Sequence, residues 1–202
     1  MTTIATNAAT TALKKLFDAQ AQKAVELSGD EAGIKSLFPL LEQIDKVTEG
    51  EGWIPFVIVV QTPILTLATR MEKVVLNGKI GTSYLTDNRV DNLGDIPQGH
   101  YLAIDVEDGR AMWNIKPSMC LAQFKQTKRF GGTVFEGISV VTYEPKILQH
   151  HYIDLPGSRY GSVEVPCLCE DGGRPLLYAF WLRRADPCFG SLSCRRRLSL
   201  GV

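Results

Sequence analysis

The sequence has few cysteines, few histidines, no net charge and no long apolar run. Its five cysteines are an odd number in 202 residues, which fits reduced thiols better than a disulfide framework. No segment approaches the ~18 consecutive apolar residues of a membrane helix, and the first residues lack the continuous apolar core of a secretory signal. These absences lead us to expect a cytoplasmic protein with no membrane partner.

Charge is balanced over the whole chain but divided between its halves. The net charge of zero gives no argument for a nucleic-acid partner. Residues 1–108 contain 15 acidic and 9 basic residues, whereas residues 109–202 contain 7 and 13. The basic excess is densest at the end of the chain, where residues 174–202 contain six arginines, at 174, 183, 184, 195, 196 and 197, against one acid, Asp186. Such an excess is typical of a solvated positive face or tail, and less often of a specific anion site.

The most strongly patterned stretch is 162–182. Two apolar runs, SVEVPCLC and RPLLYAFWL, are separated by EDGG. Runs rich in β-branched and aromatic residues around an Asp/Gly break are the usual pattern of an antiparallel hairpin. We expect this hairpin to be buried, with Val165, Leu168, Leu177 and Phe180 inside, and the arginine-bearing turn after it to remain available for recognition.

The first part of the chain has the periodicity of two helices. Apolar residues recur at three- and four-residue steps from Leu13 to Leu27, after a cap at Thr10 or Thr11. A second helical segment covers 31–46, with Asp30 as its cap, and Pro39 must interrupt it because the proline ring clashes with the preceding turn. This part of the chain therefore predicts a helical hairpin laid over a sheet.

Three further patterns predict strands of the sheet and a helix that packs on it. The run WIPFVIVVQ at 53–61 is apolar on both faces, which predicts a central strand. Asp108-Gly109 predicts a hairpin turn with a return strand over 111–115. Pro117 opens a helix that extends through Phe124.

A capping box is the clearest helix signal in the sequence. Thr133 is followed three residues later by Glu136, so that each side chain can bond the backbone N–H of the other. This spacing predicts a helix from Val134 to about Tyr143.

Together these patterns predict an α+β fold. We expect one globular domain over 1–202, with a mixed, largely antiparallel sheet of about five or six strands, an N-terminal helical hairpin and further helices packed on the sheet. Residues 1–10 are small and Thr-rich and are expected to be frayed. Residues 86–99 are rich in Asp, Asn and Gly and are expected to form a long polar loop.

Resemblance to a known family extends from about Phe17 to Arg197. It is carried by FDAQAQKAVEL, PFVIVV, YLAIDVEDG, the EG of TVFEG, GSRYGSVEVPCL and FGSLSCRRR. These segments are similar to the sequences of an uncharacterised bacterial family that is catalogued only as a domain of unknown function. The resemblance implies a single domain, and it implies no reaction, substrate or cofactor.

The resemblance also covers the end of the chain, with one departure. Members of that family end in an aromatic-rich strand, an Asn-Pro-His segment and a Leu-Gly-Ser-x-Ser-Cys motif, which is matched here by Trp181, Gly190, Ser191, Ser193 and Cys194. The positions of Asn-Pro-His are occupied by Arg184, Ala185 and Asp186. If the family used that histidine, this chain would lack the function.

The cysteines and one acidic cluster are candidates for metal binding. Cys167, Cys169, Cys188 and Cys194 make a formal four-thiol set, but their spacings differ from those of zinc knuckles, and buried inert cysteine is the favoured interpretation. Asp105, Glu107 and Asp108 stand at a strand end where carboxylates could hold Mg²⁺. A turn that uses these residues is the favoured interpretation there. We expect no metal and no cofactor.

The binding surface that we expect is formed by arginines near the end of the hairpin. Arg183 and Arg184 directly follow the apolar strand, beside Asp186, and Arg159 precedes the hairpin. Arginine forks bind carboxylate or phosphate with two parallel hydrogen bonds. Cys194 completes the set of binding residues, and charge on an ordinary surface turn is the alternative interpretation.

Two classes of function remain open from the sequence. The first is a non-catalytic binding or interaction domain that uses Arg159, Arg183, Arg184, Asp186 and Cys194 for an anionic small molecule or an acidic protein surface. The second is an enzyme of unrecognised type that uses Cys194 or Asp105. We favour the first, because no nucleophile, base and orienting group can be assembled from the sequence, and the three histidines all lie upstream of the cysteine.

Overall fold

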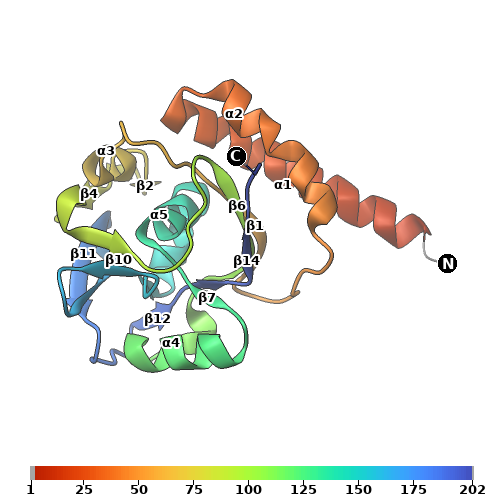
Figure 1. Cartoon of the computed structure of the whole chain (residues 1–202). Helices are drawn as coiled ribbons and strands as arrows, with labels where there is room; N and C mark the ends of the chain where they lie inside the picture. The colour runs from red at the N-terminus through yellow and green to blue at the C-terminus, as the bar shows by residue number, and fades with distance from the viewer. Residues whose placement is uncertain (1–2, 202) are drawn as a thin grey trace.

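The computed structural model of the chain describes residues 3–201 and the side chains of residues 10–201. Figure 1 shows two groups of strands with helices between and around them. The helices are α1 (Thr3–Ser28), α2 (Glu31–Ser36), α3 (Leu67–Met71), α4 (Pro117–Gln126) and α5 (Val134–Tyr143), with 3-10 turns at Phe38–Gln43, Asp87–Arg89, Arg110–Met112 and Pro145–Gln149. Among the described residues no helix is both long and apolar enough to cross a membrane.

The first sheet is built around β6. It contains β1 (Trp53–Val59), β6 (Tyr101–Glu107), β7 (Phe130–Gly131), β13 (Ser193–Cys194) and β14 (Arg196–Leu198). Strand β6 pairs with β1 along one edge and with β13 and β14 along the other, and all of these pairings are antiparallel. The last strands of the chain are therefore held beside a strand from its middle.

The second sheet is built around β10. It contains β4 (Thr82–Ser83), β5 (Val90–Asn92), β8 (Tyr152–Asp154), β9 (Ser158–Tyr160), β10 (Glu164–Asp171), β11 (Arg174–Trp181) and β12 (Phe189–Ser191), and a separate small hairpin joins β2 (Val75–Leu76) to β3 (Lys79–Ile80). The pairings of β11 with β4 and of β12 with β8 are parallel, and the others are antiparallel. These elements confirm the α+β class with largely antiparallel strands. The strands are divided between two main sheets instead of forming the one sheet expected.

The hairpin of β10 and β11 is confirmed. The two strands pair along their full length, from Glu164 opposite Trp181 to Asp171 opposite Arg174. The turn consists of Gly172 and Gly173, both with positive φ, as a two-residue hairpin turn of this twist requires. Most of the core positions expected in the hairpin are buried, since Val165, Leu168 and Leu177 have no exposed surface, while Phe180 is half-buried.

Helix α5 packs between the two sheets. Its capping box is present: Thr133 Oγ1 accepts from the Glu136 N–H, and Glu136 Oε2 accepts from the Thr133 N–H at 2.7 Å. The helix runs over Val134–Tyr143, as predicted. Its apolar side chains join one core with residues of β1 and of the β10–β11 hairpin. This helix therefore contributes to a core that lies between the two sheets.

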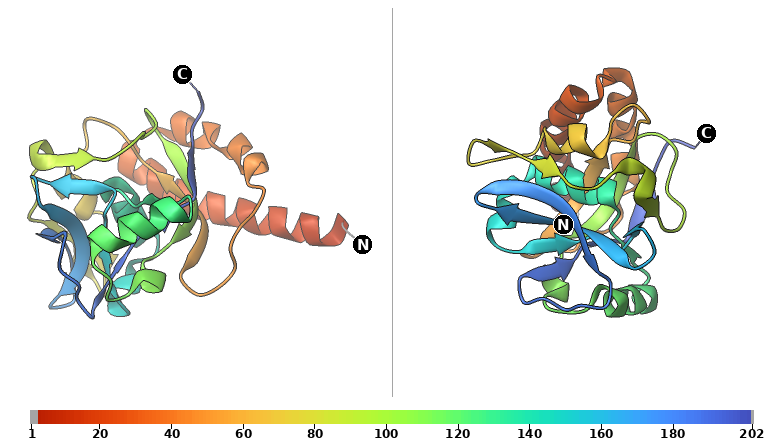
Figure 2. Two further views of the ribbon diagram at one scale, coloured as in Figure 1. Left: turned by 60° about the horizontal axis from the view of Figure 1, so that its bottom comes forward. Right: turned by 90° about the vertical axis from the view of Figure 1, so that its left-hand side faces the viewer.

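The N-terminal helices cover the outer face of the first sheet. Phe17 and Ala24 of α1 and Ile34 of α2 share a core with alternate residues of β1 and β6. Asp30 caps α2, and the helix ends at Ser36, ahead of the next 3-10 turn, which starts at Phe38 and has Pro39 as its second residue. The predicted helical hairpin is thus confirmed. Helix α1 begins at Thr3, upstream of the expected caps, and extends beyond the sheets (Figure 2). The frayed start was expected over residues 1–10, and residues 1–2 of that range lie outside the described residues.

Strand β1 is an edge strand, and the prediction that it is central was wrong. Its sequence is apolar throughout because one face packs on the N-terminal helices and the other on the core around α5. On the open edge, Gln20 takes the place of a neighbouring strand: its Nε2 donates to Phe56 O at 2.9 Å, and its Oε1 accepts from the Ile58 N–H at 2.8 Å. The Tyr143 hydroxyl donates to Ile58 O at 2.7 Å.

Two predictions about the connections were also wrong. The segment after Asp108-Gly109 forms a 3-10 turn instead of a return strand over 111–115, because acidic side chains bond its first N–H groups: Glu107 Oε1 accepts from Ala111 N at 2.8 Å, and Asp108 Oδ1 accepts from Arg110 N at 3.1 Å. The 86–99 segment is not one long loop. It contains a 3-10 turn and β5, which pairs with β9.

Candidate functional site

The five residues predicted to form a binding site are not all brought together. Arg183, Arg184 and Asp186 lie in the turn between β11 and β12, whereas Cys194 lies in the other sheet, on β13, with no exposed surface. Arg159 lies on β9, where its guanidinium donates to two nearby backbone carbonyls, at 2.9 and 2.8 Å. Burial lowers the pKa of Arg159. The predicted set therefore reduces to the β11–β12 turn.

This turn presents two arginines beside an exposed tryptophan. Trp181 is 59% exposed, and Arg183 is exposed and makes no ion pair with any described residue. The Arg184 guanidinium lies over the Phe180 ring, 4.5 Å from its centroid, and Nη2 lies 3.6 Å from Asp186 Oδ2. The ring contact orients Arg184 while its side chain stays 57% exposed.

Two other exposed apolar residues flank the same turn. The Leu182 N–H donates to Val163 O at 3.1 Å, and Leu182 O accepts from the Ser118 N–H at 3.1 Å. These bonds hold the turn beside the first residues of α4 (Figure 1). Val163 is itself one of the bonded residues, and Met119 directly follows Ser118; their exposed fractions are 48% and 59%. We call Trp181, Arg183, Arg184, Val163 and Met119 the Trp181 surface.

The arginine run 195–197 is not a solvated tail. Arg195 and Arg196 lie 3.1 and 3.2 Å from Asp45 Oδ1, and Arg197 pairs with Glu136 at 2.6 Å. All three arginines stand on or beside β14, which is held against β6. The interpretation of this run as a free positive face was wrong, because carboxylates distant in sequence neutralise it.

Asp105 holds several segments together. It is buried, with φ of 55°, and its carboxylate accepts from Thr48 N at 2.7 Å and from Arg129 Nη1 at 3.1 Å. The Arg129 guanidinium also lies over the Trp53 ring. Among the described residues no group of three or more His, Cys, Asp or Glu side chains is arranged to hold a metal ion.

The cysteines are unpaired, and most are buried. Cys120, Cys167, Cys169 and Cys194 are buried, whereas Cys188 is exposed. Burial raises the pKa of the Cys194 thiol, and the nearby Glu136 carboxylate raises it further. Burial likewise raises the pKa of Cys169 to about 12. Thiols in this state are protonated at neutral pH and have no route to a substrate.

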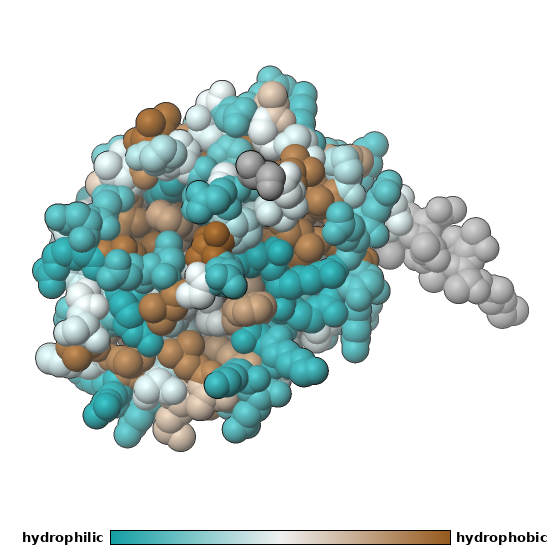
Figure 3. All heavy atoms as spheres, viewed as in Figure 1, coloured by the Kyte–Doolittle hydropathy of each residue, from teal (hydrophilic) through white to brown (hydrophobic). Residues whose placement is uncertain are grey.

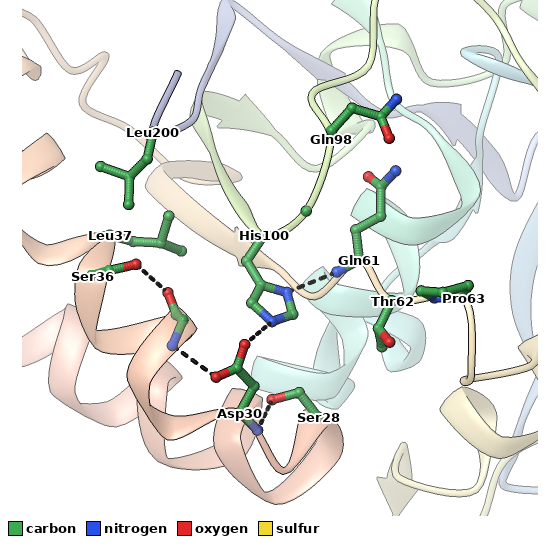
Figure 4. Close-up of a pocket in the computed structure, with 12 residues that line it drawn as sticks. Ser28, Asp30, Ser36, Leu37, Gln61, Thr62, Pro63, Gln98, His100 and Leu200 are labelled. Atoms are coloured by element: carbon green, nitrogen blue, oxygen red, sulfur yellow. Dashed lines mark hydrogen bonds and ion pairs between the residues drawn. The ribbon is translucent and has the colours of Figure 1, made fainter. Parts of the chain in front are cut away.

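A polar cavity joins residues that the sequence analysis did not connect. It lies where the α1–α2 turn meets the chain after β1 and the chain before β6 (Figure 4). His100 Nε2 lies 3.3 Å from Asp30 Oδ2, and the Gln61 backbone N–H donates to His100 Nδ1 at 3.1 Å. Asp30 was predicted only as a helix cap. No local pattern could have linked it to His100, because the two residues meet only when the helical hairpin packs against the first sheet.

Comparison with known proteins gives one match. No curated protein and no solved structure matches the chain. A family model described as "Family of unknown function (DUF5701)" matches residues 8–200. The match spans nearly the whole chain, and the protein therefore belongs to the DUF5701 family, in agreement with its resemblance to a domain of unknown function.

Proposed function

We propose that the protein is a non-catalytic interaction domain that binds an acidic segment of a partner protein on the Trp181 surface. The observation that carries this proposal is the position of Arg183 and Arg184 beside Trp181, with both arginines exposed. Exposed tryptophan and arginine are the residues most enriched among those that dominate protein–protein binding energy. The two positive charges select a partner of opposite charge.

A protein partner fits this surface better than a small anion. Trp181, Val163 and Met119 offer apolar contact area that a phosphate or carboxylate ion would leave unused. An acidic segment with an aromatic or aliphatic anchor would use both the arginines and this area. A reducing, cytoplasmic setting belongs to the proposal, since all five cysteines are unpaired.

An enzymatic role for Cys194 or Asp105 is the weaker alternative. Cys194 has no exposed surface, and its raised pKa keeps the thiol protonated. Both oxygens of the Asp105 carboxylate are engaged by a backbone N–H and by arginine. Neither group is presented to a substrate.

Selection of displayed random peptides on the folded domain tests the proposal. We expect enriched peptides to combine acidic residues with an aromatic or aliphatic anchor. Their affinity should fall about tenfold in the double variant R183A/R184A, as the loss of two exposed ion pairs predicts, and more in W181A. R174A, at the opposite end of β11, is the matched control and should bind like the wild type.

Three results would overturn the proposal. They are the absence of any enriched peptide, enrichment of peptides without acidic residues, and equal affinity of R174A and R183A/R184A for an enriched peptide. Salt dependence gives a further check, because exposed ion pairs weaken as ionic strength rises.

A further inference from the structure

The cavity between the N-terminal helices and the first sheet has the size of a small-molecule site. Its volume is about 370 Å³, within the ~300–1,000 Å³ range of ligand pockets. Its walls come from the α1–α2 turn, α2, the chain after β1, the chain before β6 and Leu200 near the carboxy terminus. It is separate from the Trp181 surface and shares no residue with it.

One side of the cavity is fixed by hydrogen bonds. Because a backbone N–H only donates, the bond from Gln61 N makes His100 Nδ1 the acceptor, so the neutral imidazole carries its proton on Nε2, toward Asp30 Oδ2. Asp30 Oδ1 in turn accepts from the Gly33 N–H at 2.8 Å. The His100 side chain is 9% exposed. The imidazole and the carboxylate are thereby held in place before any ligand arrives.

The cavity also contains one buried polar atom that lacks a partner among the described residues. Gln61 Oε1 is buried and makes no hydrogen bond with any described residue. Figure 4 shows the side chains of Gln61 and Gln98 among the residues that line the cavity. A buried carboxamide oxygen without a partner is unfavourable, and a ligand in the cavity would supply the missing bond.

The charge of the lining restricts what the cavity can hold. Asp30 is the one acidic residue among the lining residues, and the lining contains no lysine or arginine. An anionic ligand would meet this carboxylate with no cation to balance it. A cationic ligand would find a single carboxylate that is already engaged by His100 and by Gly33 N. An uncharged ligand avoids both problems.

The hydrogen-bonding groups point to hydroxyls. A carboxamide both donates and accepts, and each carboxylate oxygen of Asp30 retains a second lone pair beyond its present bond. These groups match a ligand that carries several hydroxyl groups, because each hydroxyl can both donate and accept a hydrogen bond. Leu37, Pro63 and Leu200 supply apolar contact for C–H groups, and the lining contains no aromatic ring apart from the imidazole.

From these observations we propose that the cavity binds a small, uncharged polyhydroxylated molecule of about monosaccharide size. The Gln61 and Gln98 carboxamides and the free lone pairs of Asp30 hold its hydroxyl groups. His100 positions Asp30 and leaves neither of its own nitrogens free.

Titration of the full chain with a defined panel, followed by heteronuclear NMR, tests this proposal. The neutral probes are glucose, galactose, mannose, ribose, myo-inositol and glycerol, and the charged probes are glucose phosphate and glucosamine. At least one neutral probe should bind saturably, with a dissociation constant of about 1 mM or below. The shifted amides should include those of Gln61 and His100.

Variants separate this site from a general surface effect. Q61L keeps the backbone bond to His100 but removes the carboxamide, and should weaken binding of the neutral probe about fivefold, as the loss of one hydrogen bond predicts. Q126L, at an exposed glutamine that ends α4, is the matched control and should not change it. D30N can retain the cap on α2 and should admit glucose phosphate, which the wild type excludes.

Clear outcomes would overturn the proposal. They are the absence of saturable binding by every neutral probe, equal affinity of Q61L and Q126L, and tighter binding of glucose phosphate than of glucose by the wild type. Thermal unfolding of each variant shows that it is folded before the comparison is made.

Discussion

Arg197 and Glu136 form a two-point ion pair inside the protein: Nε lies 2.6 Å from Oε1, and Nη2 lies 3.0 Å from Oε2. Their side chains are 5% and 1% exposed. The same carboxylate accepts from the Tyr101 hydroxyl at 3.0 Å and from Thr133 N at 2.7 Å. One acidic side chain thus joins β14, β6 and the first turn of α5, and the ion pair raises the pKa of Arg197 above its usual range although burial opposes this.

Truncation of Arg197 should destabilise the protein severely. R197A leaves the Glu136 carboxylate buried without its cation, which costs ~3–5 kcal/mol in comparable buried pairs. R197K should be intermediate, because an ammonium group cannot form the two parallel bonds of a guanidinium. Urea denaturation measures the change in the free energy of unfolding.

The neighbouring arginine provides the control. Arg196 pairs with Asp45 at a more exposed position, where solvent screens the ion pair and its contribution to stability is small. If R196A and R197A lower the free energy of unfolding by the same amount, the Arg197–Glu136 pair does not stabilise the contact between β14, β6 and α5 as described.

Gln20 should be needed to seal the edge of β1. Q20L leaves Phe56 O and Ile58 N without partners in a buried environment, and we expect a loss of about 2–4 kcal/mol from two unmade bonds. Hydrogen exchange at the Ile58 amide should accelerate more than exchange in the β10–β11 hairpin. Q22L, on an exposed face of the same helix, should leave both measurements unchanged.

Elements with local signals could be predicted from the sequence. The Thr133–Glu136 capping box marked the start of the α5 prediction, and the observed helix runs over Val134–Tyr143 as predicted. The EDGG break between the two apolar runs predicted the hairpin, and the structure places its turn at Gly172-Gly173. In each case the residues that determine the element lie within a few positions of it.

Long-range relationships could not be predicted in this way. The apolar run of β1 looked like a central strand because nothing near it in sequence shows that Gln20 replaces a neighbouring strand. The prediction of an exposed arginine turn gave Arg183 and Arg184 correctly, but Cys194 and Arg197 were misjudged because their surroundings depend on β6 and α5. The Asp30–His100 cavity draws on segments from both ends of the chain, and no single segment carries a pattern for it.

Stability should fall as pH rises toward neutrality because of Glu107. Burial raises the pKa of Glu107 from 4.5 to about 7, and the neighbouring Asp108 charge adds to the effect. Between these two values the native state holds a proton on Glu107 that the unfolded chain has lost. The stability that protonated Glu107 contributes is therefore fully present below pH 4.5 and is lost as pH rises through about 7. The loss is at most ~3–4 kcal/mol, for a shift from 4.5 to about 7 at ~1.4 kcal/mol per pKa unit.

Denaturation of a neutral variant as a function of pH isolates this effect. E107Q keeps an acceptor for the Ala111 N–H but cannot ionise, and should lose less stability than the wild type between pH values of about 5 and 8. Asp154 has its pKa raised to about 7, mainly by burial, so D154N should flatten the profile in the same direction. E49Q, at an exposed carboxylate, is the control. A profile for E107Q that parallels the wild type would contradict the burial of this group.

Thiol labelling of the native protein should be confined to one residue. Cys188 is exposed and the other four cysteines are buried, so a thiol reagent at neutral pH should consume one equivalent rapidly and the rest only in denaturant. C188S should abolish the rapid phase. The raised pKa of Cys194 slows its reaction further, because the thiolate is the reactive form. Rapid labelling of Cys194 in C188S would show that β13 opens to solvent, and would make the enzymatic alternative the stronger one.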